Sequence, residues 1–83
     1  MGQSDVSNLL ISGADAIGGR TARIEAEALL AHTLGRSRAW LYAHGNDVVD
    51  ARLAQCFCEK VAARATGQPL AYLIGEREFW SLV

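Results

Sequence analysis

The spacing of glycines constrains the fold of this chain most strongly. Its 83 residues are divided into short, alanine-rich stretches by Gly18-Gly19, Gly35, Gly45, Gly67 and Gly75. Alanine is the strongest helix former, and glycine commonly ends a helix because it adopts the left-handed conformation at low cost. Small apolar side chains also let helices pack closely. We therefore predict an all-α fold, a small bundle of about five helices.

Capping residues give the expected helix starts. Asp5, Ser37 and Asp50 can each accept a hydrogen bond from the first turn of a following helix. Pro69 suits the first turn of a helix, because its missing N–H would have no partner there. The expected helices run from just after Ser4 or Asp5 to Ile17, from about Thr21 to Leu34, from Arg38 to His44, from about Ala51 to Ala65, and from Pro69 to Ile74.

Three of these helices carry apolar residues at helical spacing, which predicts one core-facing side on each. The predicted sides are Val6, Leu9, Leu10, Gly13, Ala14 and Ile17 on the first helix, Ile24, Ala28, Leu30, Ala31 and Leu34 on the second, and Leu53, Ala54, Phe57, Val61 and Ala65 on the longest.

Residues 76–83 have a different character. Phe79, Trp80, Leu82 and Val83 favour a β-strand, but a lone strand cannot satisfy its backbone. We therefore expect a helical domain over residues 1–75, followed over residues 76–83 by the start of a β-hairpin whose partner strand lies beyond Val83. Without that partner, Phe79 and Trp80 should fold back on the bundle or pair with another molecule.

Two further side chains, both on predicted helices, are candidates for function. Glu27 falls among apolar neighbours, so it is either a catalytic or partner-binding acid, or an acid at the edge of the core that pairs with an arginine such as Arg77 or caps a neighbouring helix. The second interpretation is favoured, because no partner base is visible. Trp40 is expected to anchor the core rather than to serve as a ligand platform.

Charge and motif content exclude several functions. The net charge is −1 without a basic stripe, which argues against direct nucleic-acid binding, and the apolar runs are too short to span a membrane. Cys56 and Cys58 would face opposite sides of a helix, so we expect reduced thiols and no metal site. Phosphate-binding, zinc-binding and nucleophile motifs are absent from the sequence. The amino terminus lacks the pattern of a signal peptide, and we expect a cytoplasmic protein.

The stretch from Gly67 to Trp80, GQPLAYLIGEREFW, resembles the segment that joins the two domains of the HemK/PrmC family. That family shows Gly-x-Pro-Ile/Leu-x-Tyr/His-Leu/Ile-x-Gly, followed by x-Arg/Lys-Glu-Phe-Trp/Tyr. Residues 25–30, EAEALL, look like the family's Asp-Ala-Glu-x-Leu-Leu on its second helix, with Glu25 in place of the usual aspartate. Pro69, Tyr72, Arg77, Phe79 and Trp80 are therefore candidate linker or partner-contact residues.

The resemblance implies the amino-terminal domain of an S-adenosylmethionine-dependent methyltransferase that modifies the Gly-Gly-Gln glutamine of peptide chain release factors. It implies two partners for this domain, the release factor and the enzyme's own Rossmann-like catalytic domain. The glycine-rich cofactor loop and the Asn-Pro-Pro-Tyr motif would lie beyond Val83, so residues 1–83 carry no catalytic, cofactor or metal position. A self-standing helical adaptor for a protein partner is the alternative, and a small nucleic-acid-binding domain is least favoured.

Overall fold

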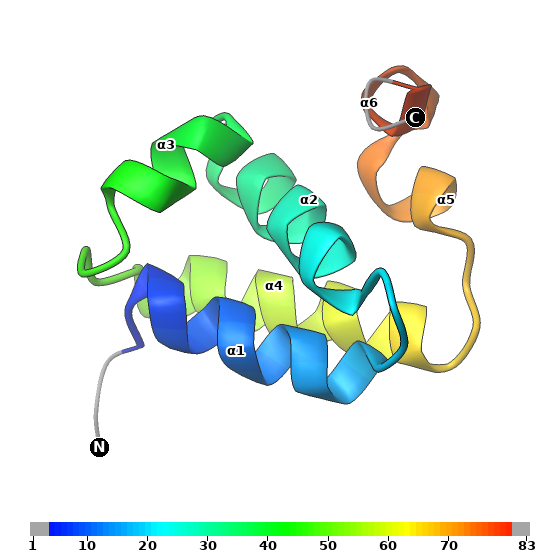
Figure 1. Ribbon diagram of the computed structural model, residues 1–83, viewed down its shortest axis with the longest axis horizontal. Helices are drawn as coiled ribbons and strands as arrows, with labels where there is room; N and C mark the ends of the chain where they lie inside the picture. Colours follow the sequence, from blue (N-terminus) through cyan, green and yellow to red (C-terminus); the bar gives the residue numbers. More distant parts are fainter. Residues whose placement is uncertain (1–3, 81–83) are drawn as a thin grey trace.

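Six helices make up the computed structural model, which describes residues 4–80 (Figure 1). Within this range the only extended pairing is one antiparallel bridge between Asp5 and Val48, so the prediction of an all-α fold is confirmed. The helices are α1 (Val6–Ile17), α2 (Ala22–Leu34), α3 (Arg38–Ala43), α4 (Ala51–Ala65), α5 (Leu70–Ile74) and α6 (Glu76–Trp80).

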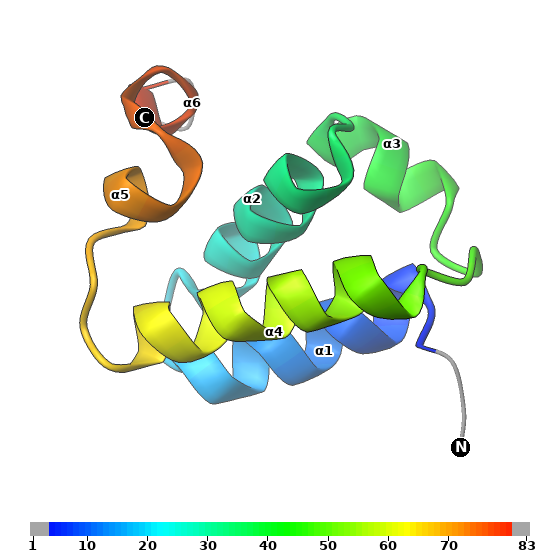
Figure 2. The ribbon, with the colours of Figure 1, turned by 180° about the vertical axis from the view of Figure 1, so that it is seen from behind.

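The helices pack around α2. Helices α1 and α4 lie side by side and run in the same direction, and α2 crosses over both of them (Figures 1 and 2). Helix α3 packs at one end of α2, while α5 contacts the other side of α2 and carries α6. Both α3 and the α5–α6 end of the chain therefore lie against α2.

The predicted capping residues start three of the helices. A side-chain oxygen of Asp5 accepts a hydrogen bond from the N–H of Asn8 at 2.8 Å, and Ser37 accepts one from Trp40 at 3.0 Å. Asp50 accepts one from the N–H of Arg52 at 3.0 Å, and Val49 before it is buried. Pro69 stands one position earlier than predicted, as the residue before α5.

The core lies where α1, α2 and α4 meet. Its largest fully buried side chain is Phe57 of α4, which contacts α1 at Gly13. A Cβ atom on Gly13 would stand 2.8 Å from the Phe57 ring, so only glycine allows this approach. The buried core cluster contains Val6, Leu9, Leu10, Ala26, Ala28, Leu29, Leu30, Ala31, Leu41, Val49, Phe57, Val61, Leu70 and Ile74.

The predicted core-facing side of α2 is partly wrong. Ile24 is 45% exposed, whereas Ala26 and Leu29 are fully buried. Helix α2 contacts α1, α3, α4 and α5, so it is enclosed on several sides and a single apolar stripe does not describe it. On α4, Ala65 is exposed for a simpler reason, because it lies in the last turn.

Residues 76–80 form the helix α6, so the predicted strand is wrong over this range. No strand lies beside them within residues 4–80, and a helical turn pairs their backbone locally, as in the bond from Phe79 N–H to Gly75 C=O at 3.0 Å. Glu76 and Glu78 in the first turn favour a helix start. Leu82 and Val83, the rest of the predicted strand, lie outside the described residues.

Candidate protein-interaction site

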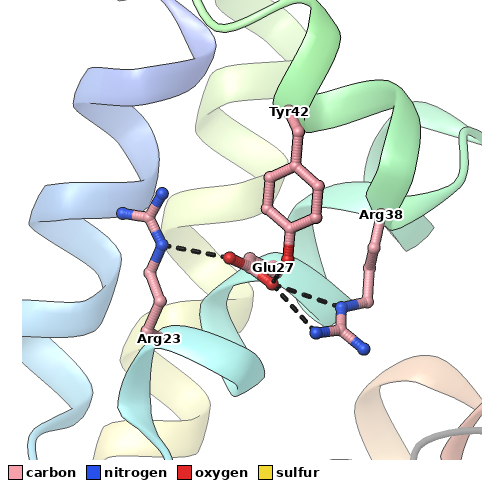
Figure 3. A network of polar contacts seen from close by, with 4 residues as sticks. All are labelled: Arg23, Glu27, Arg38 and Tyr42. Carbon is pink, nitrogen blue, oxygen red and sulfur yellow. Dashed lines mark hydrogen bonds and ion pairs between the residues drawn. The ribbon is translucent and has the colours of Figure 1, made fainter.

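Glu27 is the centre of a polar cluster between α2 and α3 (Figure 3). It is only 4% exposed, and its carboxylate accepts four hydrogen bonds. One oxygen accepts from Arg23 Nε at 3.1 Å, and the other from Arg38 Nε and Nη2 at 3.2 and 3.1 Å. The Tyr42 hydroxyl donates to the same oxygen as Arg38 at 2.7 Å. The cluster thus attaches α3 to α2 through one buried charge.

The surroundings of Glu27 set its ionisation. Burial raises the pKa of the carboxyl group. The hydrogen bonds from Tyr42, Arg23 and Arg38 together lower that pKa by more than burial raises it, so the pKa of Glu27 lies below its usual value. The group is therefore charged at neutral pH and committed to its three partners. Glu27 is thus a buried acid with arginine partners, and its role in structure or in partner contact stays a prediction. Among the described residues its arginine partners are Arg23 and Arg38, in place of the expected Arg77.

A second ion pair connects α2 to α4 and to the loop before α5. Arg64 Nε donates to Glu25 at 2.8 Å, and Arg64 Nη1 donates to the Gln68 carbonyl at 3.0 Å. Thr21 also donates to Glu25 at 2.8 Å. Burial raises the pKa of Glu25, yet the bonds from Arg64 and Thr21 hold that pKa below its usual value. Arg64 therefore fixes the course of the chain from α4 into α5.

Trp40 is partly buried against the core, as predicted, but it also belongs to a surface stack. Its ring lies 4.0 Å from the His44 ring at an angle of 11°, and the Arg36 guanidinium carbon lies 4.9 Å from its centroid. A cation over an aromatic face is attracted by the ring quadrupole. This stack holds Arg36 at the turn between α2 and α3.

The candidate residues of the exit segment lie together on α5 and α6. Tyr72 is 83% exposed and Trp80 is 64% exposed, while Phe79 packs partly against the core. The Phe79 and Trp80 rings meet edge to face at 5.9 Å. Phe79 thus folds back on the bundle, which was one of the two outcomes expected for Phe79 and Trp80, whereas Trp80 stays mostly exposed. Arg77 is exposed on the same helix. Tyr72 of α5 and Trp80 of α6 are thus exposed aromatic side chains in the exit segment.

Helix α6 is attached to α2 by a further polar contact. His32 Nδ1 lies 2.8 Å from Glu78 Oε1, and both side chains are partly exposed. No feature of the sequence pattern indicates this contact, because the two residues are far apart in the chain and lie on different helices.

Residues 4–80 hold no group of three or more His, Cys, Asp or Glu side chains that could bind a metal ion. Cys56 and Cys58 are both free, and none of the described helices is long and apolar enough to cross a membrane. What the described surface does offer is exposed arginine and aromatic side chains, the groups enriched at protein interfaces.

Known proteins resemble this chain over most of its length. Residues 9–75 match the family described as PrmC N-terminal domain. A release factor glutamine methyltransferase of Xylella fastidiosa is 49% identical over 63 residues, which are 76% of this chain and 23% of the relative. The Bordetella pertussis protein of the same name is 49% identical over 57 residues, 69% of this chain and 21% of the relative. No solved structure is significantly similar.

The matching regions are therefore short parts of longer proteins. The chain spans less than a quarter of the length of these curated relatives. A family match that covers residues 9–75 takes in α2, α3, α4 and α5 whole, together with the Glu27 cluster and Arg64. This chain belongs to the PrmC N-terminal domain family.

Proposed function

We propose that this chain is the substrate-recognition domain of an S-adenosylmethionine-dependent methyltransferase that modifies the Gly-Gly-Gln glutamine of peptide chain release factors. The observation that carries this proposal is the family match over residues 9–75 together with relatives named release factor glutamine methyltransferase at up to 49% identity. In this proposal the domain binds the release factor, and a catalytic domain encoded beyond Val83 binds the cofactor and transfers the methyl group in the cytoplasm.

The described surface is suited to recognition rather than catalysis. A methyltransferase needs a cofactor cleft, and the sequence of this chain has no glycine-rich loop after a strand. Exposed Tyr72 and Trp80 near the carboxyl end supply aromatic contact area for a protein. We place the boundary of the helical domain at Gly75 and assign residues 76–83 to the connection with the catalytic domain, where Arg77, Phe79 and Trp80 would contact it.

Methyl transfer by the full-length protein tests the proposal. Incubation with S-adenosylmethionine and a purified release factor should add one methyl group to the glutamine of the Gly-Gly-Gln loop, as read by mass spectrometry. A release factor in which that glutamine is replaced by alanine should stay unmodified. Absence of transfer to either protein would contradict the proposed activity.

The recognition role needs a separate measurement. A variant of the full-length enzyme without residues 1–75 should show a raised KM for the release factor, while its binding of S-adenosylmethionine stays unchanged. The unchanged cofactor affinity shows that the catalytic domain is still folded. If the KM of this variant equals that of the intact enzyme, residues 1–75 do not recognise the substrate.

A further inference from the structure

Arg23, Arg38 and Tyr42 surround Glu27 on α2 and α3, and Arg36 lies at the turn between these helices with its guanidinium group over the Trp40 ring; the four residues are here called the arginine face. Arg23 and Arg38 meet at Glu27, and Arg38 and Arg36 line the same surface cavity. Figure 3 shows Arg23 and Arg38 on either side of Glu27, with Tyr42 reaching it from α3. We propose that the arginine face binds an acidic segment of the protein substrate, an inference that rests on the proposed recognition function.

The distribution of charge favours an acidic ligand. The arginine face, together with Glu27 and with Glu78 of the adjoining cavity, holds three arginines and two carboxylates, a net charge of +1. The whole chain has eight basic and nine acidic residues, so the remainder has five basic and seven acidic residues, a net charge of −2. Glu27 is buried and committed to its donors, so it presents no free carboxylate oxygen to solvent. The face is thus a positive region on an otherwise acidic domain.

Glu27 holds the two flanking guanidinium groups in place and leaves part of each available. Arg23 binds Glu27 through Nε alone, and Arg38 binds through Nε and Nη2. Within residues 4–80, the terminal nitrogens of Arg23 and Nη1 of Arg38 have no hydrogen-bond acceptor, and the side chains are 52% and 37% exposed. Donors that are already oriented lose less entropy when a carboxylate binds them.

A cavity of about 160 Å³ beside Arg38 gives room for a ligand side chain. Arg36, Ser37 and Arg38 form its polar wall, and Ala28, Ala31 and Ile74 form its apolar part. Glu78 completes the lining, and its carboxylate contacts His32 at 2.8 Å. A carboxylate on a short aliphatic stem matches this combination of guanidinium donors and apolar surface. Tyr42, 61% exposed and anchored through its hydroxyl, adds a rigid aromatic contact.

Protein rather than nucleic acid fits this surface. Nucleic acid needs a run of basic residues that follows the phosphate backbone, whereas the arginine face is compact and is surrounded by a net acidic domain. Arginine and tyrosine with a buried, hydrogen-bonded centre are typical of protein interfaces.

The test uses a double variant, Arg23→Gln with Arg36→Gln, in the full-length enzyme. Arg38 is kept, because Glu27 would lose two of its donors without it. Arg52→Gln is the matched control, since Arg52 is exposed on α4 and its side chain makes no hydrogen bond or ion pair within residues 4–80. The double variant should raise the KM for the release factor about fivefold or more with kcat unchanged, and the control should stay within about twofold.

Direct binding separates this inference from the proposed function. A fluorescent hexaglutamate peptide should bind the wild-type enzyme more tightly than a hexaglutamine peptide, and the double variant should lose that preference. If the enzyme does not methylate release factors but this pattern holds, the proposed function fails and the arginine face stands. Equal binding of the two peptides, an equal effect of Arg52→Gln, or preferential binding of an RNA hexamer to the same face would overturn the inference. If the double variant does not fold, Arg36→Gln alone replaces it in the KM and peptide-binding measurements, because this single variant leaves every donor to Glu27 in place.

Discussion

Glu27 is stabilised despite its burial because both oxygens of its carboxylate accept hydrogen bonds. An isolated buried charge is strongly unfavourable, and removing one member of a buried pair is more costly than the pair itself is stabilising. Here the cost of burial is reduced, since Arg23 and Arg38 stay partly hydrated at 52% and 37% exposure. The charge therefore acts as a fixed point for α3, whose six residues bury only Leu41.

We predict that Glu27→Gln lowers the free energy of unfolding by about 2 kcal/mol at pH 7, because hydrogen bonds to a charged group are stronger than those to a neutral amide. Glutamine preserves the size of the side chain but removes the charge that two guanidinium groups share. Chemical denaturation followed by circular dichroism measures the change.

Glu59→Gln is the control for this change. Glu59 is exposed on α4, so its replacement should alter the free energy of unfolding by less than about 0.5 kcal/mol. Equal losses for the two variants would show that the Glu27 cluster does not hold α3 to α2.

The residues around Glu27 show how far the sequence could predict a contact. Arg23 lies four residues before Glu27, a spacing at which helix side chains meet, so this partner was accessible to sequence reasoning. Arg38 and Tyr42 reach Glu27 only because α3 turns back over α2, and that angle depends on tertiary packing. The sequence predicted Arg77 as the partner of Glu27, and this was wrong because no local feature of the sequence determines where α6 lies.

At the scale of elements, local chemistry predicted helix ends well and failed at α6. Asp5, Ser37 and Asp50 cap the helices that follow them, because a cap depends on its own side chain and the next turn. The aromatic residues of α6 favour a strand, but a strand depends on a neighbouring strand that residues 4–80 do not provide. The prediction that Ile24 faces the core was wrong for a similar reason, because the buried sides of α2 depend on the several helices that contact it.

Helix α6 should be the element that is most easily detached. It has five residues, none of them buried, and a polar contact to α2 between Glu78 and His32. We predict that Glu78→Gln speeds amide hydrogen exchange in residues 76–80, including the Phe79 amide, because that contact is weakened. The free energy of unfolding of the bundle should change by less than about 0.5 kcal/mol, since a partly exposed polar contact contributes little.

Glu76→Gln is a matched control within the same helix. It removes the same charge from the same first turn, but Glu76 has no hydrogen bond or ion pair from its side chain within residues 4–80. Exchange in residues 76–80 should therefore stay close to wild type in this variant. If both variants speed exchange equally, the cause is helix charge and not the contact with His32.

At the scale of the whole molecule, α2 joins its neighbours through both apolar and charged contacts. Its buried alanines and leucines pack against α1 and α4, while Glu25 binds Arg64 of α4 and Glu27 binds Arg38 and Tyr42 of α3. The two carboxylates thus act on different neighbours of the same helix. Anything that protonates them should weaken the bundle as one unit rather than release a single helix.

Acid should weaken the bundle by protonating Glu25 and Glu27, and the direction of the change in stability follows from their pKa shifts. The pKa values of Glu25 and Glu27 are lowered in the folded state, so below the ordinary pKa of a glutamate the unfolded chain binds more protons than the folded one. Their contribution is fully present at pH 7 and is lost as the pH falls from about 5 through the folded pKa values. The free energy of unfolding, measured by denaturation at pH 7, 5, 4 and 3, should therefore fall steeply over this window.

The double variant Glu25→Gln with Glu27→Gln should start lower at pH 7 and show a flatter profile, whereas Glu59→Gln should keep the wild-type slope. A double variant as acid-sensitive as the wild type would place the acid response elsewhere in the molecule.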